Sequence, residues 1–393
     1  MTAAKKESNR IVALDMHPDL FSAACLQGSD PASAKILWTR DRLPTADLEK
    51  WAGENLKQGD TLVLEASGNS FEVAHRLHGL GYAALVLESC QASKIRHGFC
   101  DDDRQSAIKL ARVHLTGLAR IVWQPDEATR QRREMLFAYR NAVKDATRSR
   151  NRIRSYLNER CVRLPKGAQL TQPSGKAKAL SMREWSELQK MLIEDAFEQL
   201  WAAEKRRKDL ERAMAREIAA EPKWAQLYRL MGVRHRVAFA LMAIVGDVNR
   251  FPKAKKLVAY LGLSPRKKQS GNDAKGKQLG IGNGGRGDVR ALLIQSAHNA
   301  LAQRGSPLHA WGWKLLVRKN RQMAVAAVAR KLAVAIWHLL KGHYSALLEA
   351  SDHLVTKLYK IATVIGKEAL KEMGFANRSE FTDKQIELLK QST

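Results

Sequence analysis

The sequence predicts an α/β N-terminal domain, a long helical segment and a mostly α-helical C-terminal region. Short β-branched and apolar runs alternate with helix-like segments in roughly the first 100 residues. Apolar residues then recur at spacings of three and four, and helical periodicity interrupted by glycine and proline follows. We therefore expect parts at 1–125, 126–225 and 226–345, with a helical accessory tail at 346–393.

The first part has the pattern of five strands and intervening helices. The strands are expected at 10–17, 20–26, 35–43, 61–68 and 83–89, and the helices at 45–56 and 70–81. A further helix follows an acidic run at 101–103. Three antiparallel strands followed by alternating strand and helix are the order of an RNase H-like domain, so we expect that α/β fold here.

Two long helices are expected in the middle part. The first covers 127–159 and carries many arginines beside its apolar stripe, and the second covers roughly 182–220. Between them, residues 164–180 are rich in Gly, Pro, Lys and Gln, which predicts a linker or a flexible tip. An antiparallel hairpin and an intermolecular coiled coil both suit these helices, because their alanine-rich stripes do not fix an oligomeric state.

Charge is the dominant compositional feature. The formal net charge of +27 and the isoelectric point near 10.1 exceed what solubility requires and favour a polyanionic partner, above all nucleic acid. A generally sticky basic protein is the plain alternative. The four cysteines are isolated, and neither a signal peptide nor a run of ~18 apolar residues is present. We expect a soluble cytoplasmic protein with no membrane partner.

Carboxylates interrupt two of the predicted strands. Asp15 lies inside IVALDMH, Glu65 lies near the end of LVLEASG, and the run 101–103 precedes a helix. Burying a carboxylate is costly unless it is paired or binds metal. Acids from two strands and a helix start suit a pair of Mg²⁺ ions for phosphoryl transfer. The alternative is structural: Asp15 caps a turn, Glu65 pairs with an arginine, and the acidic run caps its helix.

The stretch from Ser264 to Arg290 is almost free of apolar residues and surrounds Ser270 with lysine, arginine and glycine. Glycine lets backbone N–H groups approach a phosphate, and cations compensate charge on phosphoryl oxygens if Ser270 attacks phosphorus. A loop that only binds the nucleic-acid backbone is the alternative. Residues 232–247 also resemble half of a helix-hairpin-helix, although Arg234 and His235 stand where a second glycine is usual.

These motifs together resemble the DEDD transposases of insertion sequences, which include the Piv-type DNA invertases. The resemblance covers roughly residues 10–340 and is sharpest from Arg250 to Gly271, where FPKAKKLVAYLGLSPRKKQSG occurs in the family's order. It implies a RuvC-type RNase H-like domain, a coiled coil and a C-terminal transposase domain. It also implies a DNA recombinase.

Carried over by position, the resemblance makes Asp15, Glu65 and Asp103 the metal-binding acids and Ser270 the nucleophile that links transiently to DNA. The family's fourth acid falls on Ser106, which is a departure. Either Asp101 or Asp102 supplies the missing oxygen, or three carboxylates suffice, or catalysis is impaired. We retain Asp102 as a candidate ligand.

The resemblance further implies partners and a cofactor. These are Mg²⁺ or Mn²⁺, the element ends and target DNA, a structured guide RNA, and a homo-oligomer (dimer or tetramer) associated with the bacterial nucleoid. Two other functions stay open: a metal-dependent junction resolvase or nuclease, and a nucleic-acid-binding protein with a decayed catalytic domain. The candidate nucleic-acid-binding residues are Arg148, Arg152, Arg266, Lys267, Lys268, Lys275, Lys277 and Arg286.

Overall fold

The computed structural model divides the chain into two compact units, residues 1–126 and 127–393, which we describe separately. The structure describes residues 10–95, 103–165, 169–268, 277–282, 284–304, 307–343 and 351–391. For Asp103, Lys267, Lys268 and Lys277 this description covers the backbone and not the side chain.

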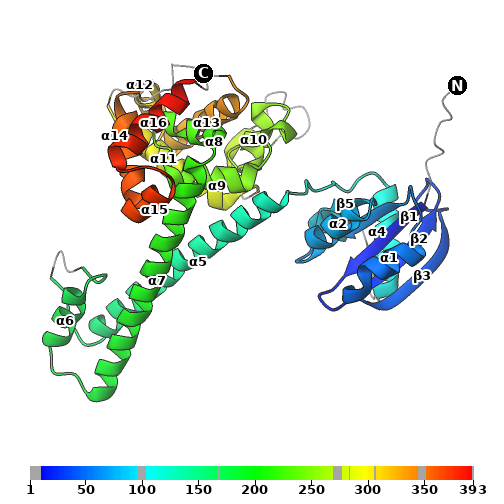
Figure 1. Ribbon diagram of the computed structural model, residues 1–393, viewed down its shortest axis with the longest axis horizontal. Helices are drawn as coiled ribbons and strands as arrows, with labels where there is room; N and C mark the ends of the chain where they lie inside the picture. The colour runs from blue at the N-terminus through cyan, green and yellow to red at the C-terminus, as the bar shows by residue number, and fades with distance from the viewer. Residues whose placement is uncertain are drawn as a thin grey trace. The chain divides into compact units, whose positions relative to one another are not determined.

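A five-stranded mixed sheet forms the centre of the first unit (Figure 1). Its strands are β1 Arg10–Met16, β2 Leu20–Gln27, β3 Lys35–Pro44, β4 Thr61–Glu65 and β5 Ala83–Leu87. In space they are ordered β3-β2-β1-β4-β5, with β2 antiparallel to both β3 and β1, and β4 parallel to both β1 and β5. The predicted α/β part, with three antiparallel strands followed by two parallel ones, is confirmed.

Helices cover both faces of this sheet. They are η1 Thr45–Asp47, α1 Leu48–Asn55, α2 Ser70–Gly79, α3 Ser89–Ile95 and α4 Asp103–Leu115. Leu14 and Leu64 pack with α1 and α2 on one face, whereas their strand neighbours Ala13 and Val63 pack with α4 on the other. Because successive side chains of a strand point to opposite faces, this assignment also fixes where the polar residues of β1 and β4 lie.

A long helical hairpin begins the second unit. It consists of α5 Glu127–Asn158 and α7 Glu187–Ala219, with the short helix α6 Pro173–Ser181 near its tip (Figure 1). Arg132 pairs with Glu217 and Arg150 with Glu204, so the two long helices run antiparallel. The intramolecular hairpin is thus present, and an intermolecular coiled coil stays a prediction.

The segment expected to be a linker or flexible tip contains α6 and packs into a small core that it shares with α5 and α7. Leu170 and Ala179 are buried against α7, and the indole Nε1 of Trp201 donates to the carbonyl of Leu170 at 3.1 Å. A Cβ on Gly175 would lie 2.3 Å from the carbonyl oxygen of Gln169. The glycine that suggested a break is therefore a close-packing position.

The remaining elements form one large apolar core into which the ends of α5 and α7 also pack. They are α8 Pro222–Ala225, η2 Gln226–Arg229, α9 His235–Val245, η3 Val248–Arg250, α10 Ala254–Tyr260, β6 Pro265–Lys268, β7 Lys277–Ile281, α11 Gly287–Ala302, α12 Pro307–Leu316, α13 Arg321–Leu340, α14 Ser351–Ile365, α15 Lys367–Glu372 and α16 Arg378–Gln391. The mostly helical C-terminal part is confirmed, and its last helices pack into this core. Helix α12 and the antiparallel hairpin β6–β7 are additions to the predicted elements.

Helix α13 is long and apolar enough to cross a membrane by length and composition alone. Its buried side chains include Val328, Leu332 and Ile336, which belong to the large core. Among the described residues it is the one helix that passes this test, and its place in the core accounts for its composition.

Candidate functional site

Asp15 and Glu65 lie side by side at the carboxyl ends of two neighbouring parallel strands. The register pairs Leu14 of β1 with Leu64 of β4, so the next residue of each strand carries a carboxylate at the same level. Ala13 and Val63 lie on the face of the sheet that α4 covers. Asp15 and Glu65 each follow one of them by two positions, so the alternation of side chains along a strand places both acids on that same face. The two strands that carry these acids are thus neighbours in the sheet.

The start of α4 lies at the same end of the sheet. Arg104, in its first turn, pairs with Asp41 of β3 at 3.1 Å. Asp15 pairs with Ser22 of β2. The residues on either side of Ser22 pair with Leu43 and Arg40 of β3, so Asp41 lies in the same row across the sheet. Helix α4 thus begins near the level of the two carboxylates, and on their face.

An irregularity in β3 marks this row. The register with β2 shifts between Phe21 and Ala23, and Arg42 adopts a left-handed backbone with φ of 53°. Such bulges re-aim side chains next to functional sites. On the neighbouring strand, Ser22 is 2% exposed and faces the same side as Asp15 because it alternates with Phe21 and Ala23 of the opposite face.

Hydrogen bonds from two loops fix the turn that follows β1. Asn69 Nδ2 donates to the carbonyl of His17 at 2.9 Å, and the hydroxyl of Thr45 reaches the same oxygen at 3.4 Å. Asn69 precedes α2, and Thr45 opens η1. The backbone just beyond Asp15 is therefore held by segments 28 and 52 residues away in the chain.

The described residues supply two of the expected acids at one place. Asp15 and Glu65 are partly exposed, and the carboxylate of Asp15 makes no hydrogen bond or ion pair with another described residue. Within these residues no group of three or more His, Cys, Asp or Glu side chains is placed to hold a metal ion. Asp102 and the side chain of Asp103 lie outside the described residues. Ser106, at the position of the family's fourth acid, is 9% exposed.

In the second unit, the base of the β6–β7 hairpin is built by close approach of two glycines. Gly262 and Gly285 have φ of +70° and +78°, and a Cβ on Gly285 would lie 2.6 Å from the backbone nitrogen of Gly262. Arg290 Nη1 donates to the carbonyls of Gly282 at 2.8 Å, Gly262 at 3.2 Å and Gly284 at 3.3 Å. One guanidinium therefore holds the hairpin to α10 and α11.

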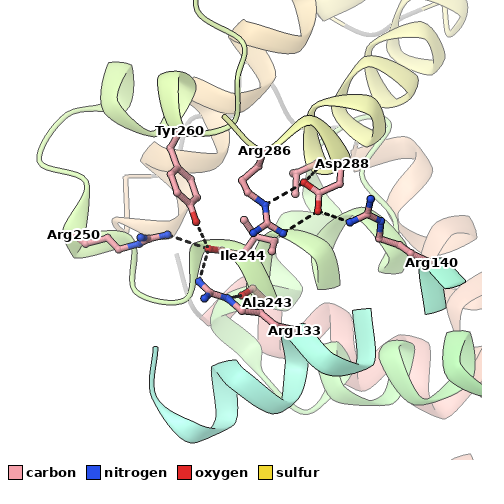
Figure 2. A network of polar contacts seen from close by, with 9 residues as sticks. Arg133, Arg140, Ala243, Ile244, Arg250, Tyr260, Arg286 and Asp288 are labelled. Atoms are coloured by element: carbon pink, nitrogen blue, oxygen red, sulfur yellow. Dashed lines mark hydrogen bonds and ion pairs between the residues drawn. The ribbon is translucent and has the colours of Figure 1, made fainter. Parts of the chain in front are cut away.

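Arginines also gather at the carboxyl end of α9 (Figure 2). The carbonyl of Ile244 accepts from Arg250 at 3.0 Å, from the hydroxyl of Tyr260 at 3.4 Å and from Arg133 of α5 at 3.5 Å. Arg250 lies over the rings of Phe251 and Tyr260, with centroid distances of 4.4 and 4.5 Å. Cations favour this end of a helix, where carbonyls lack intrahelical partners.

Asp288, at the start of α11, binds two arginines (Figure 2). Its Oδ2 lies 2.9 Å from Arg286 Nη2 and 2.8 Å from Arg140 Nη1 of α5. Burial acts to raise the pKa of Asp288, but the hydrogen bond from Arg286 and the charges of Arg286 and Arg140 outweigh it and lower that pKa. Arg286 thus has a structural partner in addition to its predicted role at nucleic acid.

The other predicted nucleic-acid-binding residues are distributed over the second unit. Arg148 and Arg152 lie on exposed parts of α5, and Arg152 donates to Gln199 at 2.6 Å. Arg266 is exposed on β6. The backbones of Lys267, Lys268 and Lys277 belong to the hairpin. Ser270 and Lys275 lie outside the described residues.

Sequence reasoning did not single out Arg140, Asp288 or Arg290, which organise the base of the hairpin. The signal for them is the run GGRGDVR, in which an acid and two arginines follow glycines at a helix start. Strand-end carboxylates in one unit and a strongly basic helical surface in the other are features of proteins that act on nucleic acids.

Comparison with known proteins shows similarity to transposases. Residues 225–311 match the model of the transposase IS116/IS110/IS902 family, a span that includes α9, α10, both hairpin strands and α11. Three relatives carry transposase names. The transposase for insertion sequence element IS1111A of Coxiella burnetii is 27% identical over 84% of this chain and 89% of its own length. "Putative transposase y4qE" of Sinorhizobium fredii is 24% identical over 70% and 74%, and "Probable family 20 transposase" of Pseudomonas aeruginosa is 29% identical over 38% and 44%.

These matches support similarity to a family of insertion-sequence transposases. The predicted resemblance is confirmed at that level. Its sharpest part, from Arg250 to Gly271, lies inside the segment that matches the family model.

Proposed function

We propose that this chain cuts and rejoins DNA strands at the ends of an insertion sequence, by phosphoryl transfer at Asp15 and Glu65 in an RNase H-like first unit. The observation that carries the proposal is the placement of both carboxylates at one level, on one face, beside the start of α4. A pair of acids from adjacent parallel strands with a helix start above them suits phosphoryl transfer, because it gathers hard oxygen ligands around one point.

The cofactor that fits this arrangement is Mg²⁺ or Mn²⁺. Asp15 and Glu65 are the ligands we propose, with Asp103 and Asp102 completing the set from the start of α4. When bound, a divalent cation neutralises charge on phosphoryl oxygens and lowers the pKa of an attacking hydroxyl or water. The carboxylate of Asp15 has no competing partner among the described residues, which leaves it available as a ligand.

The nucleophile we propose is the hydroxyl of Ser270. Its oxygen would bond to phosphorus, the bond from phosphorus to one deoxyribose oxygen would break, and the hydroxyl proton would pass to solvent or to that leaving oxygen. The strands that flank this serine carry Arg266, Lys267, Lys268 and Lys277, whose charges suit a phosphodiester. The alternative roles are a nuclease in which Ser270 only holds phosphate, and a binding protein without catalysis.

The partners we propose are the element ends, the target DNA and a structured guide RNA, held by a dimer or tetramer of this chain. The net charge of +27 supports two or more polyanions on one protein. Arg148 and Arg152 extend the basic surface along α5. Recombination of DNA at full rate by RNA-free protein would contradict the proposal that an RNA guides this chain.

Substitution of both proposed sites tests the mechanism. Full-length protein is incubated with Mg²⁺ and DNA carrying the element's ends, and a denaturing gel resolves nicked DNA and covalent protein–DNA adducts. Asp15→Asn and Glu65→Gln should reduce both products at least ~100-fold, because one carboxylate is lost from the site. Ser270→Ala should abolish the adduct.

The matched control is Glu54→Gln, since Glu54 is an exposed acid of the same unit on α1, which covers the other face of the sheet. It should leave both products unchanged. Nicking that survives Ser270→Ala without an adduct would favour the nuclease, and equal behaviour of Asp15→Asn and wild type would remove the proposed active site.

A further inference from the structure

A basic cavity lies in the second unit, where the start of α9, one side of α11 and the first half of α14 meet. Its volume is about 610 Å³. The residues around it include Arg234, Arg236, Gln295, Asn299 and Lys357. Small-ligand sites commonly have volumes of ~300–1,000 Å³, so this space accommodates a phosphate together with the nucleotide attached to it.

Positive charge dominates the cavity wall. Arg234, Arg236, Lys357 and Lys360 line it together with His353, and the described part of the wall contains no Asp or Glu. Arg236 is partly neutralised by Glu211 at 3.2 Å. Arg234 and Lys360 are both exposed, and neither forms an ion pair with a described residue. The cavity therefore presents uncompensated cations to solvent.

Lys357 is the buried member of this cluster. It is 8% exposed, and its Nζ donates to the carbonyls of Tyr228 at 2.5 Å and Leu230 at 2.8 Å. Burial, with a smaller effect of the nearby Arg234 charge, lowers its pKa to about 7. An anion in the cavity would favour the charged form of this amine, so binding would take up a proton.

The floor of the cavity is rigid. Gly232 has φ of +78°, and a Cβ there would lie 2.4 Å from the carbonyl oxygen of Ser296 on α11. This contact holds the segment before α9 directly against α11. The cations of α9 are therefore presented by a fixed backbone, which reduces the ordering cost of binding.

One side of α11 adds amides to the wall. Gln295 and Asn299 of α11 are four residues apart and line the cavity together with Gln303, which directly follows the helix, whereas the opposite side of α11 packs in the core. Amide groups both donate and accept hydrogen bonds, which matches the edges of unpaired bases. Cations on one wall and amides on another suit a single nucleic-acid strand, with its phosphates on α9 and α14 and its bases toward α11.

We infer that this cavity binds a single-stranded nucleic-acid segment, at a site separate from Asp15 and Glu65. The inference does not depend on the proposed chemistry, because every residue that carries it belongs to the second unit. The shared chemistry is a phosphodiester strand with unpaired bases, and either DNA or RNA can supply it.

Fluorescence anisotropy with a labelled 12-nucleotide oligothymidylate, in EDTA, tests the inference on the full-length protein. Arg234→Gln with Lys360→Gln should weaken binding at least ~10-fold at ~0.15 M salt. The slope of log affinity against log salt should fall by about 1.4, since each lost phosphate contact on a single strand contributes about 0.7. Gln295→Ala with Asn299→Ala should weaken binding without changing that slope.

The matched control is Lys371→Gln, which removes one charge from an exposed position on α15 outside the cavity. It should leave the affinity within about twofold. Thermal unfolding of each variant separates lost contacts from lost structure. An unchanged affinity in the folded double variant, or an equal loss in the control, would overturn the inference.

Two further probes identify the strand. A 12-nucleotide oligouridylate that binds more tightly than oligothymidylate supports the site and assigns it to RNA, and the reverse order assigns it to DNA. If the double variant Arg234→Gln with Lys360→Gln loses as much affinity for a 12-base-pair duplex as for either single strand, the preference for unpaired bases is refuted. Asp15→Asn should bind all probes like wild type, so failure of the proposed active site would leave this result unaffected.

Discussion

At the scale of single residues, two constraints act together at Gly232. Its backbone is left-handed, and Ser296 of α11 occupies the space that a side chain would need. A left-handed non-glycine residue costs ~1–3 kcal/mol. The steric conflict with backbone adds to this cost, because neither segment has a flexible side chain to move.

We expect Gly232→Ala to reduce the free energy of unfolding by at least ~3 kcal/mol. The matched control is Gly374→Ala, because Gly374 has φ of +85° in the same unit and no atom within 4 Å of its would-be Cβ. Urea denaturation of both variants measures the difference. Equal losses would mean that the contact with Ser296 contributes nothing.

Lys357 is a second residue whose environment has a measurable consequence. The unfolded chain holds this proton up to about pH 10.5 and the folded chain up to about pH 7, so between these values the unfolded state binds more protons. Stability then rises with pH, by at most about 1.4 kcal/mol per pH unit. The groups that face this amine are Arg234, His353, Lys360 and the carbonyls of η2 and its following residue.

Between pH 7 and pH 9 we therefore expect the free energy of unfolding of wild type to rise by about 2 kcal/mol relative to that of Lys357→Met. Urea denaturation at pH 7, 8 and 9 measures it, with Lys371→Met as the exposed control, for which no pH-dependent difference is expected. A constant difference between wild type and Lys357→Met across this range would show that Lys357 titrates normally.

At the scale of elements, α4 matters because its first turns lie over the carboxyl end of the sheet. Ser106 is buried on this helix at the position where the family has an acid. A carboxylate there would add to the negative charge of Asp15 and Glu65. Without a cation the three carboxylates would repel one another, and with a cation present they would bind it more tightly than two carboxylates do.

Ser106→Asp should therefore lower the melting temperature in EDTA and enlarge the increase that Mg²⁺ produces. Thermal unfolding with and without ~10 mM Mg²⁺ measures both effects. Ser106→Asn is the uncharged control and should show neither. A Ser106→Asp variant whose response to Mg²⁺ equals that of wild type would place the cation elsewhere.

The elements also show what the sequence can and cannot specify. The five strands follow from short apolar runs between turn residues. The sequence leaves open whether the strands of Asp15 and Glu65 are neighbours, because β1 and β4 are not consecutive and become neighbours only in the folded sheet. Their common face needs the register of β1 with β4. The hairpin β6–β7 escaped prediction because PRKK and KQLGI show no apolar alternation, and contacts of Arg290 with distant glycine carbonyls stabilise its base.

At the scale of the whole molecule, sites assembled from distant segments are the hardest to predict. The basic cavity joins residues near 234, 299 and 357, whose charges look like ordinary solvated surface in the sequence. Net charge predicted a polyanion partner without locating it. The resemblance to transposases could be found from local motifs, because the match to the family model lies in one continuous stretch, residues 225–311.

Helix α5 links the large C-terminal core to the tip of the hairpin. Arg133 and Arg140 anchor it to the end of α9 and to Asp288, and the same unbroken helix continues to Asn158 beside the tip with α6. At 1.5 Å per residue, the distance from Arg140 to Asn158 is roughly 27 Å. One continuous helix therefore spans from the ion pair with Asp288 at the first turn of α11 to the tip of the hairpin.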